Sequence, residues 1–150
     1  MDEIVGRCLC GAVEYSAAEP GVFVTCYCRD CRYASGGAPA NVLLVQQAGF
    51  KLRQGAANLQ EYKSTADSGH GVTREFCGNC GTPMFERLEI LEPQAMLIRV
   101  GTVDAQQDLK PEVTVWTKSI PAWEKLQDTT VHFEANPDDE EMARRLAGKS

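Results

Sequence analysis

Cys26-Tyr27-Cys28-Arg29-Asp30-Cys31 is the middle one of three cysteine clusters, which together contain all seven cysteines of this 150-residue chain. The other two are Cys8-Leu9-Cys10 and Cys77-Gly78-Asn79-Cys80. Around a tetrahedral Zn²⁺ with Zn–S bonds of about 2.3 Å, neighbouring sulfurs lie roughly 3.8 Å apart. A C-x-C pair on an extended segment puts both side chains on one face, and a C-x-x-C turn curls two sulfurs toward one point. Each cluster therefore forms part of a metal site, and seven ligands divide into one closed site of four and one site of three with a vacant position.

Other uses of clustered cysteines fit the sequence less well. An odd number of cysteines in adjacent pairs is poor material for disulfides, because residues one or two apart rarely bridge without strain. The opening Met1-Asp2-Glu3-Ile4 does not resemble a signal peptide, which predicts the reducing cytoplasm, where such spacing more often means metal or redox chemistry. The C-x-C-x-x-C run does not match ferredoxin spacings, and Cys77–Cys80 is not set in the βαβ pattern of a thioredoxin-type site. The sequence predicts a protein with two zinc sites.

Length and composition limit the class of protein and its partners. A chain of this length fits one domain, residues 1–150, that buries about two-thirds of its unfolded surface, and its 43% hydrophobic and 24% charged residues are ordinary for a globular protein. No apolar run approaches the ~20 residues of a membrane span. The net charge of −6 opposes a surface that binds phosphate, so we expect no nucleic-acid partner. The sequence does not indicate an oligomeric state.

Short segments of β type dominate the chain. Alternating or continuous apolar residues predict strands at 11–15, 22–24, 41–45, 72–76, 83–86, 95–100 and 113–116. Residues 50–52 and 59–62 are predicted to form a hairpin around Gly55-Ala56-Ala57-Asn58. One helix is predicted at the C-terminus, where Asn136-Pro137 supplies a cap and Asp138 to Glu141 place acids in the first turn. The fold class is therefore mainly β with a short C-terminal helix.

The order of the motifs resembles one known family, the glutathione-dependent formaldehyde-activating (GFA) family, also called the CENP-V/GFA domain. The resemblance runs through 6–15, through 26–32 with Ser35-Gly36, and through 74–81. It continues through 100–104 and ends with Trp116 and Pro121-Ala122-Trp123. It covers about residues 6–133 and leaves 134–150 as a C-terminal tail or helix. It implies an Mss4-like β-sheet fold that zinc holds together.

The resemblance also divides the seven cysteines. It implies that Cys8, Cys10, Cys77 and Cys80 hold a structural zinc, and that Cys26, Cys28 and Cys31 hold a second, catalytic zinc. The chain departs from the family at two places that do not involve these ligands. It has Tyr27 and Thr114 where the family commonly has histidine, and both departures concern substrate contacts.

The activity that the resemblance implies is a carbon–sulfur lyase reaction that joins glutathione and formaldehyde reversibly as S-(hydroxymethyl)glutathione. A thiol that binds the vacant position loses its proton to become the nucleophile; alternatively, zinc polarises the carbonyl. Arg32 and Ser35 are candidate contacts for the thiol substrate. Two other functions stay open: a non-catalytic zinc-stabilised binding module, and a thiol or metal stress protein.

Five other residues are weaker candidates for a role in metal or substrate binding. His70 and His132, the only histidines, are predicted to lie outside the metal sites. Trp116 and Trp123 could line a ligand pocket, although aromatic residues among strands are more often part of the core. Asp104 follows a Gly-Thr-Val turn and is predicted to be a turn residue.

Overall fold

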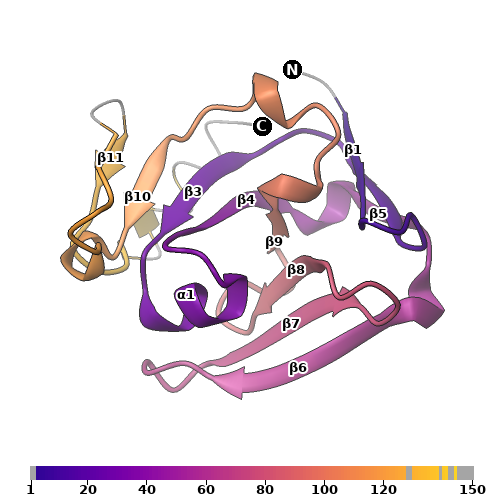
Figure 1. Cartoon of the computed structure of the whole chain (residues 1–150), viewed down its shortest axis with the longest axis horizontal. Helices are drawn as coiled ribbons and strands as arrows, with labels where there is room; N and C mark the ends of the chain where they lie inside the picture. The colour runs from indigo at the N-terminus through magenta and orange to yellow at the C-terminus, as the bar shows by residue number, and fades with distance from the viewer. Residues whose placement is uncertain (1–2, 128–129, 139, 142–143, 145–150) are drawn as a thin grey trace.

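The computed structural model describes residues 3–127, 130–138, 140–141 and 144, and β-strands dominate it (Figure 1). The strands are β1 (Ile4–Arg7), β2 (Glu14–Ala17), β3 (Val22–Cys26), β4 (Ala40–Gln46), β5 (Phe50–Gln54), β6 (Leu59–Thr65), β7 (Gly71–Cys77), β8 (Pro83–Leu88), β9 (Ala95–Arg99), β10 (Val113–Val115) and β11 (Val131–His132). One α-helix is α1 (Arg29–Ser35), the described residues 140, 141 and 144 are helical as well, and five 3₁₀ turns lie at 47–49, 56–58, 100–102, 106–108 and 117–119.

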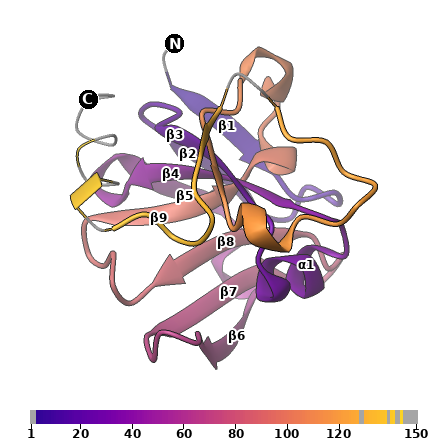
Figure 2. The same ribbon diagram turned by 90° about the vertical axis from the view of Figure 1, so that its left-hand side faces the viewer.

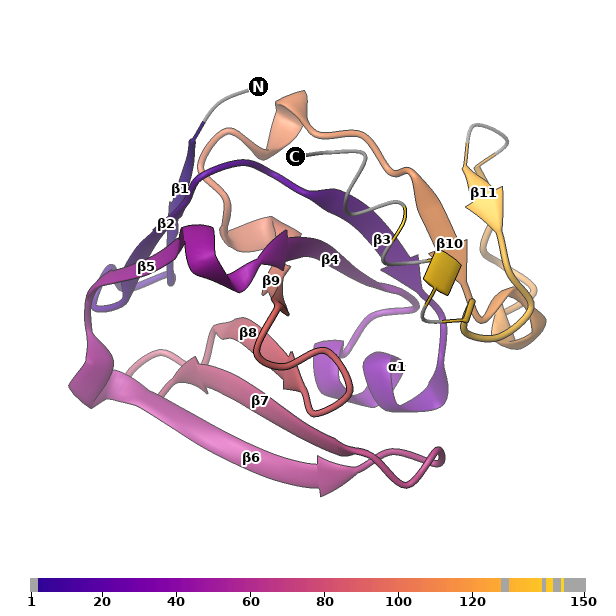
Figure 3. The ribbon, with the colours of Figure 1, turned by 180° about the vertical axis from the view of Figure 1, so that it is seen from behind.

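The strands form two sheets. The larger has eight strands in the order β11-β10-β3-β4-β9-β8-β7-β6, and the smaller has three in the order β1-β2-β5 (Figures 1 and 3). Pairing is antiparallel except at β10, which runs parallel to both β3 and β11. An isolated bridge between Gly6 and Val103 ties the small sheet to the loop that follows β9.

Two apolar clusters cover the two faces of the large sheet. The cluster between the sheets contains Tyr15, Phe85 and their neighbours; the two rings pack edge to face at 5.2 Å between centroids. The second cluster lies on the other face and includes Val24, Val113 and Cys26. Successive side chains of a strand point to opposite faces, so β3, which is buried along its whole length, contributes Phe23 to one cluster and its neighbours to the other.

The predicted strands at 22–24, 41–45, 72–76, 83–86 and 95–100 are confirmed with slightly different ends. The predicted hairpin of residues 50–52 and 59–62 is wrong. β5 pairs with β2, and β6 pairs with β7. The connection turns at Gly55, where φ is +94°, and it takes the chain from one sheet to the other instead of folding it back.

The helices differ from the prediction as well. The sequence analysis missed α1, which has seven residues and none of them buried, so it lacks the apolar period that marks a longer helix. Much of the predicted C-terminal helix lies outside the described residues. Within the described part, Asp138 Oδ1 accepts a hydrogen bond from the Glu141 backbone N–H at 2.7 Å. No helix in the described part of the chain is both long and apolar enough to cross a bilayer.

Candidate metal centres

Four cysteines from the two sheets meet at one point. Cys8 and Cys10 lie in the connection between β1 and β2, whereas Cys77 ends β7 and Cys80 lies in the following turn. Their sulfur atoms all lie within 4.8 Å of one another, with Cys8 Sγ 3.6 Å from Cys10 Sγ and Cys10 Sγ 3.8 Å from Cys77 Sγ. These separations match the edge of a zinc–thiolate tetrahedron. The group therefore suits a closed metal site that joins the small sheet to the large one.

Two tight turns bring these sulfurs together. The Gly11 N–H donates to the Cys8 carbonyl at 3.1 Å, and the Gly81 N–H donates to the Cys77 carbonyl at 2.7 Å. Gly11 and Gly81 have φ values of +82° and +81°, which glycine adopts without the steric cost that a Cβ would add. The glycine after each cysteine pair is thus what closes the turn.

Hydrogen bonds to sulfur favour the thiolate form that a metal binds. Asn79 Nδ2 donates to Cys10 Sγ at 3.2 Å and lowers the pKa of that thiol. Thr82 Oγ1 lies 3.2 Å from Cys80 Sγ and, with backbone N–H donors, lowers the pKa of Cys80 to about 5. Hydrogen bonds to the charged form of an acid favour ionisation, so the Cys80 thiol is ionised at neutral pH.

The second group is local in sequence. Cys26 ends β3, Cys28 caps the N-terminus of α1, and Cys31 lies in the first turn of the helix. Their sulfurs also lie within 4.8 Å of one another. Cys28 Sγ accepts the Cys31 backbone N–H at 3.3 Å, as an N-cap side chain does. Hydrogen bonds from Cys26 and Cys31 hold the pKa of Cys28 far below its ordinary value. The pKa of Cys26 is raised by its hydrogen bonds with Cys28 and Cys31 and by burial.

The three-cysteine group is bounded by apolar residues on one side and by solvent on the other. Cys26 is buried, whereas Cys28 and Cys31 are half-buried. Trp116 and Phe133 pack against the cluster that contains Cys26, and Figure 2 shows α1 at the end of the molecule near β6, β7 and β8. Within the described residues, no fourth His, Cys, Asp or Glu joins these three cysteines as a possible metal ligand.

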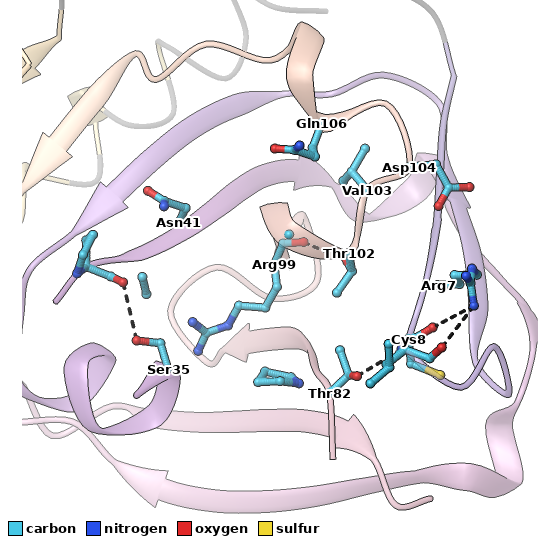
Figure 4. A pocket seen from close by; sticks show the side chains of 15 residues that line it. Arg7, Cys8, Ser35, Asn41, Thr82, Arg99, Thr102, Val103, Asp104 and Gln106 are labelled. Carbon is cyan, nitrogen blue, oxygen red and sulfur yellow. Dashed lines mark hydrogen bonds between the residues drawn. The ribbon is translucent and has the colours of Figure 1, made fainter. Parts of the chain in front are cut away.

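A cavity of about 660 Å³ is lined by Cys8 of the four-cysteine group, whereas Cys26, Cys28 and Cys31 do not line it. At one end it reaches Cys8 and Arg7, and at the other it reaches Ser35 and the start of β4, which follow α1. Figure 4 shows Arg99 extending from the end of β9 across the middle of this space. Its lining is mixed: Arg7, Arg99 and Asp104 are charged, Asn41 and Gln106 are amides, and the rest are small or apolar residues.

The sequence analysis missed the importance of Arg99. Its side chain is 9% exposed and forms an ion pair with Glu86, whose side chain is 4% exposed. A buried charge is costly unless it is paired, so this pair holds β8 and β9 together at the cavity wall. The signal in the sequence was weak, because Arg99 stands at the end of an apolar strand and Glu86 is followed by a second charged residue, Arg87.

The two candidate substrate contacts occupy different positions. Ser35 lines the cavity, and its hydroxyl accepts the Gly37 N–H at 3.1 Å. Arg32 is exposed, and its guanidinium lies 4.6 Å from the ring centroid of Tyr33. The structure therefore brings Ser35, but not Arg32, to the cavity wall.

The two residues that depart from the family pattern do not line the cavity. Tyr27 is buried, and its backbone N–H donates to the Val115 carbonyl at 3.2 Å. Thr114 is also buried, and its hydroxyl lies 2.9 Å from that of Thr130.

The remaining candidates lie outside both cysteine groups. His70 lies beside Glu89, and His132 Nε2 lies 2.9 Å from the Gln127 carbonyl. Trp116 packs against the second cluster and donates from Nε1 to Asn136 Oδ1 at 2.8 Å, whereas Trp123 is 80% exposed. Asp104, predicted to be a turn residue, lines the cavity.

Comparisons with known proteins agree with this geometry. The chain is similar over 71% of its length to a Rhodobacter sphaeroides protein of known crystal structure, with a TM-score of 0.55 and 22% identity, and the match covers 91% of that protein. This likeness concerns the fold alone. A search of curated protein sequences gives no significant match. The model of one family, described as "Glutathione-dependent formaldehyde-activating enzyme", matches residues 3–119. The predicted mainly-β fold with clustered cysteines is therefore confirmed, and the chain belongs to the GFA family.

Proposed function

We propose that this chain is a zinc-dependent enzyme of carbon–sulfur lyase type, which joins a thiol such as glutathione to formaldehyde or a related small electrophile. The observation that carries the proposal is the inequality of the two cysteine groups. Cys8, Cys10, Cys77 and Cys80 supply four sulfurs, enough for a closed structural zinc. Cys26, Cys28 and Cys31 supply three, which suits a catalytic zinc with one position left for substrate.

The reaction balances without an oxidant or reductant. The thiol sulfur forms a bond to the aldehyde carbon, the C=O π pair moves to oxygen, and the thiol proton ends on that oxygen. When bound, zinc supplies acidity, because it favours the thiolate over the thiol in a coordinating ligand. Three thiolates already place a formal charge of −1 on a Zn²⁺ site, which weakens its pull on a carbonyl. The cysteines therefore favour delivery of a thiolate over activation of the aldehyde.

The cavity supports a thiol substrate that carries carboxylates, as glutathione does. Arg7 places a positive charge at one end of the cavity, and Ser35 supplies a hydroxyl at the end that follows α1. The guanidinium of Arg99 at the cavity wall is already paired with Glu86. Arginine binds carboxylates in a bidentate manner. Arg32, on the exposed face of the same helix, would attract the substrate from solvent without lining the cavity.

The compartment, the class of partner and the number of domains complete the proposal. A free thiol substrate and thiolate ligands require a reducing compartment, so we place the protein in the cytoplasm. The net charge of −6 opposes nucleic-acid binding. We treat residues 1–150 as one domain.

The test separates metal content from turnover. Metal analysis of the purified protein should give two zinc ions per chain, and exchange NMR should show thiol–formaldehyde adduct formation faster than the uncatalysed reaction. Cys28→Ser should remove one zinc and the rate enhancement while it leaves the fold intact. The matched control is Cys10→Ser, the same change at an exposed ligand of the other group, whose folded fraction should keep the rate enhancement.

The panel should contain several thiols and aldehydes, because Tyr27 and Thr114 depart from the family pattern. If the two-zinc protein accelerates none of these reactions, the enzyme proposal fails and a zinc-stabilised binding module takes its place. If X-ray absorption shows a fourth protein ligand at Cys26, Cys28 and Cys31, both metals are structural.

A further inference from the structure

The outermost strand of the large sheet has one edge without a paired strand among the described residues. This strand, β6, has seven residues and pairs with β7 alone in the described part of the chain (Figures 1 and 3). It contains no proline, and its register with β7 runs from Leu59 to Thr65 without a shift. A long, unbulged edge strand without proline is a template for strand addition. The strand at the other end of the sheet, β11, has two residues and offers almost no template.

The backbone hydrogen bonds at the ends of β6 fix which residues face outward. The Ala66 N–H donates to the His70 carbonyl at 2.9 Å, and the Asn58 carbonyl accepts the Gly78 N–H at 2.7 Å. The backbone groups of even-numbered residues therefore face β7. Because these groups alternate in direction along an antiparallel strand, those of Leu59, Glu61, Lys63 and Thr65 face outward.

The charges on β6 select one register for pairing with a second copy of the chain. Two copies of β6 can pair antiparallel about a twofold axis, with their outward-facing backbone groups hydrogen-bonded to each other. We compare the three registers in which this axis passes through residue 61, 62 or 63. The first register places Glu61 opposite itself, and the last places Lys63 opposite itself. Centred on Tyr62, the pair places Glu61 opposite Lys63 twice. Opposite charges across a strand pair stabilise it, and like charges destabilise it.

We infer that this chain forms a twofold-symmetric dimer through antiparallel pairing of β6 with β6 of a second copy, centred on Tyr62. The two tyrosines then face each other in a non-hydrogen-bonded pair, where side chains approach most closely. The Tyr62 ring, 63% exposed in the single chain, loses solvent there.

The edge strand β5 of the small sheet differs from β6 in its charge pattern. β5 also pairs on one side only, with β2. Its charged residues are Lys51 and Arg53, and it has no acidic residue. Self-pairing of β5 therefore brings cations together without a partner, so the charge pattern favours β6 as the dimer edge.

The test uses two single charge reversals of exposed residues, Glu61→Lys and Lys63→Glu. Sedimentation equilibrium of the zinc-loaded wild-type chain should show a monomer–dimer equilibrium that salt shifts toward monomer, because exposed charges are screened. Each variant alone should dimerise at least about tenfold more weakly, since both cross-strand pairs become like-charged. An equimolar mixture should restore the dimer, because one chain then carries two lysines on its edge and the other two glutamates.

The mixing experiment makes the inference easy to overturn. A wild-type chain that stays monomeric into the submillimolar range contradicts it. Variants that dimerise as well as the wild type place the interface elsewhere. Variants that are monomeric both alone and mixed exclude the Tyr62-centred register. Circular dichroism and zinc content should match the wild type, since both side chains are exposed.

Discussion

The two cysteine groups should differ sharply in their contribution to stability, and paired substitutions test this difference. Cys77→Ser alters the four-cysteine group, and Cys28→Ser alters the three-cysteine group. The contact between Cys10 and Cys77 spans 67 residues. If a metal cross-link restricts the unfolded chain as a disulfide does, closing a loop of that length contributes about 4 kcal/mol to the free energy of unfolding. A loop as short as that between Cys26 and Cys31 contributes about 2 kcal/mol.

Total stability for a protein of this kind is about 5–15 kcal/mol. We therefore expect Cys77→Ser to lose one zinc and about 4 kcal/mol, with a large fall in the urea midpoint. Cys28→Ser should also lose one zinc, but no more than about 2 kcal/mol. The measurements are urea unfolding followed by circular dichroism, and metal analysis of the same samples. Equal destabilisation by the two variants, or unchanged stability of Cys77→Ser, would refute this reasoning.

Three further predictions concern the protein away from the metals. Burial raises the pKa of Tyr15 to about 12 from an ordinary value of 10.0. The Tyr15 hydroxyl therefore keeps its proton to a higher pH in the folded state than in the unfolded state. Stability should fall by about 3 kcal/mol between pH 10 and 12; Tyr15→Phe should remove this fall, and an unchanged alkaline limb contradicts the assignment. Arg99→Met leaves Glu86 buried without its ion partner and should cost about 3–5 kcal/mol in urea unfolding. Arg99→Met combined with Glu86→Leu should recover most of that loss, and no recovery would argue against the pair. Gly36→Ala should cost about 1–2 kcal/mol, because φ is +73° but a Cβ meets no atom within 4 Å. Gly21→Ala should cost clearly more, since its Cβ would lie 2.0 Å from a backbone carbonyl oxygen; equal costs would mean that this backbone shifts freely.

The strands and the cysteine groups were predictable for a common reason. Buried strands carry their apolar residues in the local sequence, and a ligand pair such as Cys77-Gly78-Asn79-Cys80 carries its turn geometry with it. The geometry of the two groups follows the division that the resemblance implied. The metal that they hold and the role of each residue stay predictions.

Features that depend on partners distant in the sequence were not predictable in this way. The turn residues at Gly55 indicated a reversal, but they carried no information on which sheet each flanking segment would join. The cavity is assembled from the ends of β1, α1 and β9 with the loops that follow. No single stretch of sequence contains it, and of its lining residues the sequence analysis named Cys8, Ser35 and Asp104 for other reasons.

The wide separation of the four-cysteine ligands sets an order of events during synthesis. Cys26, Cys28 and Cys31 leave the ribosome together, so their group is complete at once. Another 46 residues must be added before Cys77 exists. At about 5–20 residues per second, this interval lasts roughly 2–10 s. During that time Cys8 and Cys10 have each other and no second pair. The growing chain therefore completes its three-cysteine group first, and the four-cysteine group that joins the two sheets is complete only after Cys80 has been added.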